Sequence, residues 1–205
     1  MFRSITRIVS NEGPPRSFLL VDTSGSMSET DLQPSRLEAA KDAACEYIRE
    51  LCNARPETLV TVIGYSNKTD IQCKNRDMRE GPRHVWEAVR RLRGGGTTHM
   101  GKALKAVQHN LSLTLYAGPV HVVLLSDGYH NGRFNPVKIA DSIKKRDSAR
   151  IDCVGVGSDH LSVDELLLRK IASLDENGRP RYHFIKDGVQ LVEHFRRLAG
   201  FLSRE

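Results

Sequence analysis

Runs of apolar residues alternate along this chain with segments in which apolar residues recur at helical spacing. A short apolar run bounded by turn residues predicts a strand buried on both faces of a sheet, whereas spacings of three and four predict a helix with one buried face. Apolar runs of the first kind occur at 17–22, 58–65, 120–125, 151–157 and 182–185. Helical spacing begins near residues 35, 82, 100, 136, 162 and 189.

This order of elements predicts an α/β fold, with a doubly wound, mostly parallel sheet and helices on both faces. One further short strand is expected at 69–73. The turn at 66–68 is too short for a parallel crossover, so this strand must pair antiparallel with 58–65. We expect residues 1–14 to be an N-terminal extension and residues 15–205 to form one domain.

Three helix starts carry capping signals. Ser35 with Glu38, and Ser162 with Glu165, have the spacing of a capping box, in which a hydroxyl and a carboxylate satisfy the free backbone N–H groups. Asn135 precedes a proline and is typical of an N-cap followed by the first helical turn. These signals predict where the three helices begin.

Polar side chains follow the apolar runs at the places where the predicted strands leave the core. The first run leads into Asp-Thr-Ser-Gly-Ser, with a carboxylate at Asp22 and hydroxyls at Ser24 and Ser26, and a later run ends in Ser-Asp-Gly with Asp127. In doubly wound sheets, sites form at the carboxyl ends of the strands, and a glycine-rich loop such as 94–101 can approach that edge. Carboxylate and hydroxyl oxygens suit a hard cation such as Mg²⁺.

Together these segments resemble the metal-ion-dependent adhesion site (MIDAS) of the von Willebrand factor A domain. The resemblance is carried by Asp-Thr-Ser-Gly-Ser, Thr-Thr-His-Met-Gly-Lys-Ala-Leu and Leu-Leu-Ser-Asp-Gly, and the order of elements fits the family over about 17–203. We take Thr98 rather than Thr97 as the ligand, because its spacing to Gly101 fits the family pattern. The implied ligand set is Asp22, Ser24, Ser26, Thr98 and Asp127.

The resemblance implies a stand-alone intracellular domain whose six-stranded sheet has one antiparallel edge strand. It implies Mg²⁺, or Mn²⁺ or Ca²⁺ in its place, held directly by the serines and partly through water by the aspartates. In the family, the counterpart of Thr98 joins the metal when a partner binds, and an acidic residue of the partner takes the open coordination position. The resemblance therefore implies a protein-binding module without enzymatic activity, an adaptor or regulatory subunit that acts beside a larger complex such as an AAA+ ATPase.

An alternative of another class is a hydrolase or phosphatase that uses the same metal. Residues 96–102 nearly match a phosphate-binding P-loop, but Ala103 stands where a serine or threonine should hold Mg²⁺. A phosphoaspartyl hydrolase resembling the haloacid dehalogenase family needs a second aspartate two residues after the first, and Ser24 occupies that position. These departures disfavour both kinds of enzyme.

Four histidines need separate interpretation. His99, His130 and His160 fall on loops at the predicted site edge, where they are either exposed loop residues or groups that contact a ligand or a softer metal. His121 lies inside a predicted strand and is expected to be a packed, hydrogen-bonded residue.

The net charge of +6 favours acidic partners, and part of the excess lies in the basic stretch 74–93. Nucleic-acid association through that stretch is a further alternative, although no recognised nucleic-acid motif accompanies it. The four cysteines lack a CxxC pair, which favours reduced thiols. With no secretory signal at the N-terminus and no apolar run approaching the length of a membrane span, we expect a cytoplasmic protein.

Overall fold

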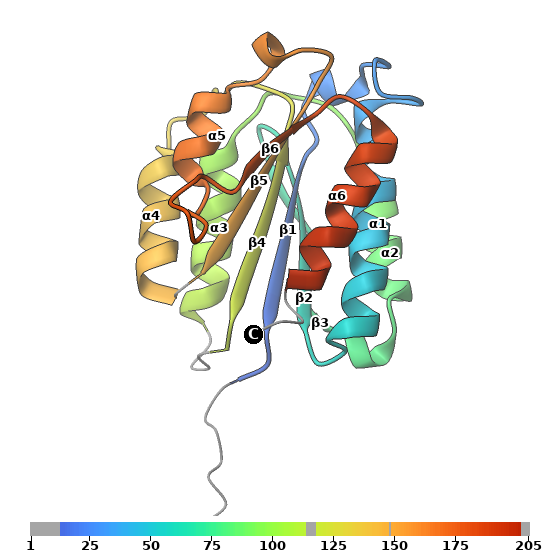
Figure 1. Cartoon of the computed structure of the whole chain (residues 1–205), viewed down its shortest axis with the longest axis vertical. Coiled ribbons are helices and arrows are strands. Elements are labelled where there is room, and N and C mark those ends of the chain that lie inside the picture. The colour runs from blue at the N-terminus through green and yellow to red at the C-terminus, as the bar shows by residue number, and fades with distance from the viewer. Residues whose placement is uncertain (1–12, 114–117, 148, 202–205) are drawn as a thin grey trace, which may run out of the picture.

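The computed structural model describes residues 13–113, 118–147 and 149–201. Within these residues, six strands and six α-helices follow one another along the chain (Figure 1). The strands are β1 Arg16–Asp22, β2 Leu59–Tyr65, β3 Thr69–Asp77, β4 Val120–Ser126, β5 Arg150–Val156 and β6 Tyr182–Ile185. The α-helices are α1 Arg36–Ala54, α2 Arg83–Arg90, α3 Met100–Ser112, α4 Pro136–Asp147, α5 Glu165–Ile171 and α6 Gly188–Phe201.

The six strands form one sheet in the order β3-β2-β1-β4-β5-β6. Strand β3 is antiparallel to β2, and every other pair is parallel. The predicted doubly wound sheet with one antiparallel edge strand is therefore confirmed. Because the chain builds outward from β1 in both directions, the winding reverses between β1 and β4, which is where doubly wound sheets place their sites.

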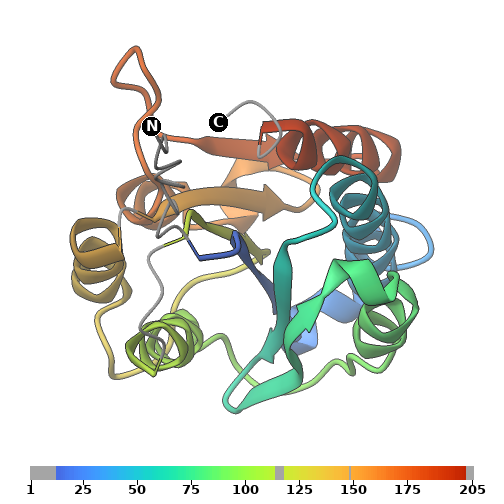
Figure 2. The ribbon, with the colours of Figure 1, turned by 90° about the horizontal axis from the view of Figure 1, so that it is seen from below.

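Helices cover both faces of the sheet, with α1, α2 and α6 on one side and α3, α4 and α5 on the other (Figures 1 and 2). Successive side chains of a strand point to opposite faces, so β1 feeds two separate cores. Leu19 and Val21 pack with the α1 layer, whereas Phe18 and Leu20 pack with the α3 layer. This is why an uninterrupted apolar run predicts a strand buried on both faces.

Two predictions about element boundaries are wrong. Strand β3 continues past Cys73 to Asp77, because its outer half pairs with β2 at the sheet edge while exposing polar side chains that leave no apolar pattern. Ser162 does not cap the following helix, since Asp164 accepts the hydrogen bond from the backbone N–H of Leu167. The Ser162 hydroxyl instead donates to the carbonyl of Asp159.

Other predicted features are confirmed. The Ser35 side chain accepts from the N–H of Glu38, and the Asn135 side chain accepts from that of Lys138. All four cysteines are free thiols. Most of the predicted extension at 1–14 lies outside the described residues, so the domain boundary stays a prediction.

A buried network of polar side chains connects α1 with β1, β4 and β5. The Tyr47 hydroxyl lies 2.8 Å from Ser17 Oγ and 3.0 Å from Nδ1 of His121, and Nε2 of His121 lies 2.7 Å from Asp152. Burial raises the pKa of the Asp152 carboxyl, but hydrogen bonds and charge from His121 and Arg150 outweigh it and hold this pKa at about 2. His121 is thus the packed, hydrogen-bonded residue that its position in a strand predicts.

Removing the Tyr47 hydroxyl should cost more stability than a single hydrogen bond usually contributes. In Tyr47→Phe, both Ser17 and His121 lose a buried partner, so we expect the free energy of unfolding to fall by about 1–3 kcal/mol. Urea denaturation of the purified domain measures this difference.

Tyr182→Phe is the matched control for that experiment. The Tyr182 side chain is also buried, but its hydroxyl has no hydrogen-bond partner among the described residues. Its removal should leave stability unchanged within about 0.5 kcal/mol. Equal losses in the two variants would contradict a role for the network.

Candidate metal centre

The candidate site lies at the carboxyl ends of β1 and β4, which are neighbouring parallel strands. Strand β1 ends at Asp22 and β4 ends at Ser126, one residue before Asp127. Asp22, Ser24 and Asp127 are almost fully buried, and Ser26 is half-buried at the start of a short 3-10 turn, Gly25–Ser28. The parallel pairing therefore brings together the two loops that the sequence predicts to share an edge.

Hydroxyl and carboxylate oxygens converge between these loops. Ser24 Oγ lies 3.1 Å from Ser26 Oγ, and both hydroxyls donate to Oδ1 of Asp127, at 3.4 Å and 2.9 Å. Asp22 accepts from the backbone N–H of Ser24 at 2.8 Å and from the hydroxyl of Ser126 at 2.7 Å. Four of the five predicted ligands thus form one connected cluster.

The spacing of these oxygens fits a small octahedral cation. Ligands at 2.0–2.1 Å from Mg²⁺ in neighbouring octahedral positions lie about 3 Å from one another. Ser24, Ser26 and Asp127 present oxygens at nearly that separation. Throughout the described ranges, no three His, Cys, Asp or Glu side chains cluster as a metal site, so the donors here are hydroxyls beside two carboxylates. The assignment of these residues as ligands stays a prediction.

The fifth residue, Thr98, is brought to the same place by the loop between α2 and α3. A Cβ atom on Gly128 would lie 3.5 Å from Thr98 Oγ1 and 4.0 Å from Ser26 Oγ, so both hydroxyls face this glycine. Thr98 does not cap α3, whose N-cap is His99. Its hydroxyl is therefore not engaged in closing the helix.

Backbone contacts hold the Thr98 loop against both neighbours. The N–H of Gly25 donates to the carbonyl of Gly96, a residue whose φ of 88° suits glycine. The N–H of Asn131 donates to the carbonyl of Thr98 at 2.8 Å, and the Asn131 side chain accepts from the N–H of Thr98 at 3.3 Å. A Cβ on Gly101 would lie 2.3 Å from the carbonyl oxygen of Phe134, so only glycine permits this close approach.

Arg36, which the sequence interpretation missed, carries the positive charge of the site. It is 3% exposed, and its guanidinium contacts Oδ2 of Asp127 at 3.0 Å, Asp31 at 2.6 Å and Glu29 at 2.6 Å. Arg36 is the first residue of α1, where the helix dipole disfavours a cation. An arginine at this unfavourable position could have indicated, from the sequence alone, that a carboxylate of the same chain lies next to it.

Burial dominates the electrostatics of both aspartates. It raises the pKa of Asp22 to about 7, with the charge of Asp127 as the second cause. Burial also raises the pKa of Asp127, although hydrogen bonds from Arg36 and Ser26 oppose the change. A bound dication would supply the opposite charge that Asp22 lacks and would favour its ionised form.

The three loop histidines have local partners. Nε2 of His99 lies 3.3 Å from Thr97 Oγ1, and Nε2 of His130 lies 2.9 Å from the carbonyl oxygen of Phe134. His160 pairs with Glu165. These contacts do not reach the five clustered residues, and a role of the histidines in ligand contact stays a prediction.

The basic stretch 74–93 is partly neutralised by its own carboxylates. Ion pairs join its arginines to neighbouring acidic residues: Arg76 to Glu80, Arg79 to Asp77, and Arg83 to Glu87. The charge available for nucleic acid is therefore smaller than the count of arginines suggests. None of the helices in the described part of the chain has the length and apolarity that crossing a membrane requires.

Curated relatives cover part of the chain. A UPF0353 protein of Mycolicibacterium paratuberculosis is 30% identical over 130 residues, which are 61% of this chain and 38% of the relative. A UPF0353 protein of Mycobacterium sp. (strain KMS) is 26% identical over 181 residues, or 77% of this chain and 52% of the relative. The chain thus spans about half or less of the length of these relatives.

Solved structures share the fold at low sequence identity. A von Willebrand factor type A protein from Catenulispora acidiphila has a TM-score of 0.75 at 23% identity, covering 93% of this chain and 43% of that one. Proximal thread matrix protein 1 of the mussel byssus, in a structure with a zinc-occupied MIDAS motif, has a TM-score of 0.75 at 18% identity and covers 96% of this chain and 47% of that one.

The family profile of the von Willebrand factor type A domain matches residues 18–196, from the first buried strand to the last helix. The match agrees with the sheet order and with the fold of the solved structures. This chain belongs to the von Willebrand factor type A domain family.

Proposed function

We propose that this domain is a magnesium-dependent protein-binding module that takes an acidic residue of its partner at the metal. The observation that carries the proposal is the convergence of hydroxyl and carboxylate oxygens at the carboxyl ends of β1 and β4. The residues that would hold the metal are Asp22, Ser24, Ser26, Thr98 and Asp127. When bound, the dication supplies a coordination position that a carboxylate from another protein can occupy.

The donor set favours a hard cation. The mussel protein carries zinc in its MIDAS motif. In this chain the clustered donors are oxygens, whose hardness suits Mg²⁺, with Mn²⁺ or Ca²⁺ as substitutes, better than the softer zinc. Two carboxylates balance the charge of a dication while the hydroxyls add none. The loaded site would therefore not repel an incoming acidic residue, which could take the open coordination position on the metal.

Exposed apolar side chains beside the site support a protein as the partner. Tyr129, two residues after Asp127, is 54% exposed, and its hydroxyl donates to the carbonyl of Leu161, which is 85% exposed. Leu166, in the first turn of α5 at the same edge, is 74% exposed. Large apolar side chains that gather on a solvent-exposed surface are typical of protein interfaces, where a partner covers them.

We further propose that the domain works as an adaptor or regulatory subunit and not as an enzyme. A phosphoaspartyl hydrolase would need an aspartate two residues after Asp22, but Ser24 occupies that position. Its hydroxyl donates a hydrogen bond to Asp127 and offers no general acid or base. The AAA+ ATPase partner stays a prediction from the resemblance. Cytoplasmic location is part of the same proposal, and the four free thiols support it.

Magnesium should stabilise the domain, and Asp22→Asn should abolish that effect. At Mg²⁺ 100-fold above its dissociation constant, mass action contributes about 2.7 kcal/mol, which is roughly 5–10 °C in Tm for a domain of this size. Because burial already disfavours the Asp22 charge, the variant should be at least as stable as the wild type in EDTA. Calorimetry with and without Mg²⁺ measures both effects.

Asp141→Asn is the control for this change, since it removes a carboxylate that pairs with Lys144 on the surface of α4. Its Mg²⁺ shift should equal that of the wild type. A full Mg²⁺ shift in Asp22→Asn would show that the metal binds elsewhere.

Arg36 and the metal should act as alternative counter-charges for Asp127. In Arg36→Met the metal-free domain loses a buried ion pair, which costs about 3–5 kcal/mol. The affinity for Mg²⁺ should rise about tenfold, because a cation next to the site no longer repels the metal. Lys41→Met removes a charge from the same helix that pairs with Glu38 instead, and should leave the Mg²⁺ affinity unchanged. Metal affinity that falls in Arg36→Met would contradict the charge argument.

Selection from a random peptide library tests the partner chemistry directly. Peptides retained by the wild type in Mg²⁺ should share an aspartate or glutamate and should be released by EDTA. Thr98→Val should lose this retention, whereas Thr97→Val, which changes the exposed neighbouring hydroxyl, should keep it. Retention that survives EDTA, or peptides without a shared acidic residue, would refute the proposal.

A further inference from the structure

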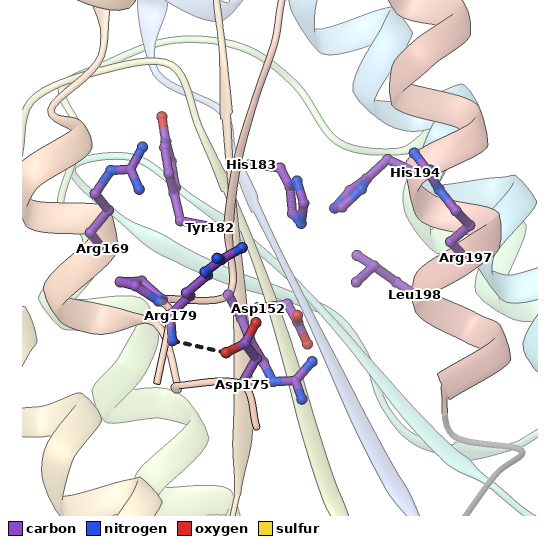
Figure 3. A pocket seen from close by; sticks show the side chains of 11 residues that line it. Asp152, Arg169, Asp175, Arg179, Tyr182, His183, His194, Arg197 and Leu198 are labelled. Carbon is purple, nitrogen blue, oxygen red and sulfur yellow. Dashed lines mark hydrogen bonds between the residues drawn. The ribbon is translucent and has the colours of Figure 1, made fainter. Parts of the chain in front are cut away.

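A cavity lies in the half of the sheet remote from the candidate metal centre. Its volume is about 600 Å³, within the range of small-molecule pockets. It spans the edge strand β6 at its amino end, between α5 with the 172–181 loop on one side and the C-terminal half of α6 on the other (Figure 3). Asp152, near the start of β5, forms part of its wall, whereas the five clustered residues lie at the opposite ends of the strands.

Arginines dominate the charge of this cavity. Four line it, from α5, the loop and α6, against two aspartates: Arg169, Arg179, Arg181 and Arg197 against Asp152 and Asp175. Asp152 is engaged by His121 and Arg150 inside the sheet, and Asp175 accepts from backbone N–H groups of its own loop at 2.8 Å and 2.9 Å. Arg169 pairs with Glu165 at 3.1 Å. Arg179 and Arg197 are exposed, and neither forms an ion pair with a carboxylate of the described residues.

An unpartnered buried imidazole also lines the cavity. His194 is 5% exposed, yet its Nε2 has no hydrogen-bond partner among the described residues. Its ring lies 4.2 Å from that of His183, and Arg197 follows one turn later on the same helix (Figure 3). Burial, followed by the charges of His183 and Arg197, lowers the pKa of His194 to about 4, so the neutral ring is the form present near neutral pH. A buried nitrogen without a partner costs free energy unless a ligand satisfies it.

The remaining wall is apolar. The Tyr182 ring, over which the Arg169 guanidinium lies at 4.7 Å, and the side chains of Pro180 and Leu198 line the space beside the charged groups. The cavity therefore offers a cationic part and an apolar part side by side. An inorganic anion alone would use only the first of these.

We propose that this cavity binds a phosphomonoester, with its phosphate among Arg179, Arg197 and His194 and its organic group against Tyr182 and Leu198. Guanidinium groups pair with phosphate oxygens through two parallel hydrogen bonds, which lysine cannot match. Arg179 and Arg197, the two cavity arginines argued above to lack an ion pair among the described residues, supply two positive charges, which suit a phosphate dianion better than a monovalent carboxylate. The ligand would bind without the metal, so this proposal is independent of the acidic partner.

Calorimetric titration of the whole chain in EDTA tests the proposal with three probes: phenyl phosphate, inorganic phosphate and benzoate. Phenyl phosphate should bind most tightly, because only this probe combines a dianion with an apolar group. Equal affinity for inorganic phosphate would overturn the organic part of the ligand, and equal affinity for benzoate would overturn the preference for phosphate. Absence of phenyl phosphate binding would overturn the proposal as a whole.

Neighbouring arginines on α6 provide the matched pair of variants. Arg197→Met should weaken phenyl phosphate binding tenfold or more, whereas Arg196→Met, which changes a residue that pairs with Glu46 outside the cavity, should leave it unchanged. His194→Leu removes the buried nitrogen and should also weaken binding; if it fails to fold, the exposed Arg197 still decides. Equal weakening by the two arginine variants would mean that binding follows the overall charge and not this cavity.

Discussion

The in-register parallel pairing of β1 with β4 is the contact on which the candidate metal centre depends. The register sets Val21 opposite Leu125, so Asp22 and Ser126 follow as neighbours and share a hydrogen bond. A slip of one residue would turn every side chain of β1 to the other face. Asp22 would then leave Ser126, and Phe18 would change from one core to the other. The register that directs successive side chains of β1 into the two cores therefore also positions the residues of the site.

The strand ends were predictable because each apolar run stops at a residue with obvious chemistry. Asp22 and Asp127 follow buried strands, and parallel topology places those ends together without any knowledge of side-chain contacts. Arg36 was not predictable in this way, since its partners Glu29 and Asp31 lie in a loop without periodicity. The cavity beside β6 could not be predicted from the sequence for a similar reason. Its charged residues come from three separate elements that only the fold brings together.

Polar groups are buried at both ends of β1, with opposite outcomes. Near its start, Ser17 belongs to a network in which Tyr47, His121 and Asp152 find partners in one another. Such a network stiffens the core and has no capacity left for a ligand. Near its end, two carboxylates lie close together and burial raises the pKa of both. Burying two carboxylates side by side disfavours their ionised forms. Such raised pKa values are typical of functional sites, and a bound cation would offset the unfavourable negative charge.

The contacts between Thr98 and Asn131 join two loops of the candidate site. Their reciprocal hydrogen bonds, together with the glycine contact at Gly101, couple the start of α3 to the segment that follows Asp127. A change that shifts the Thr98 loop to reposition its hydroxyl would also disturb the segment that carries Tyr129 and Asn131. The geometry of the candidate site and the shape of the surrounding surface therefore depend on each other, and a transplant of this site to another scaffold must carry both loops.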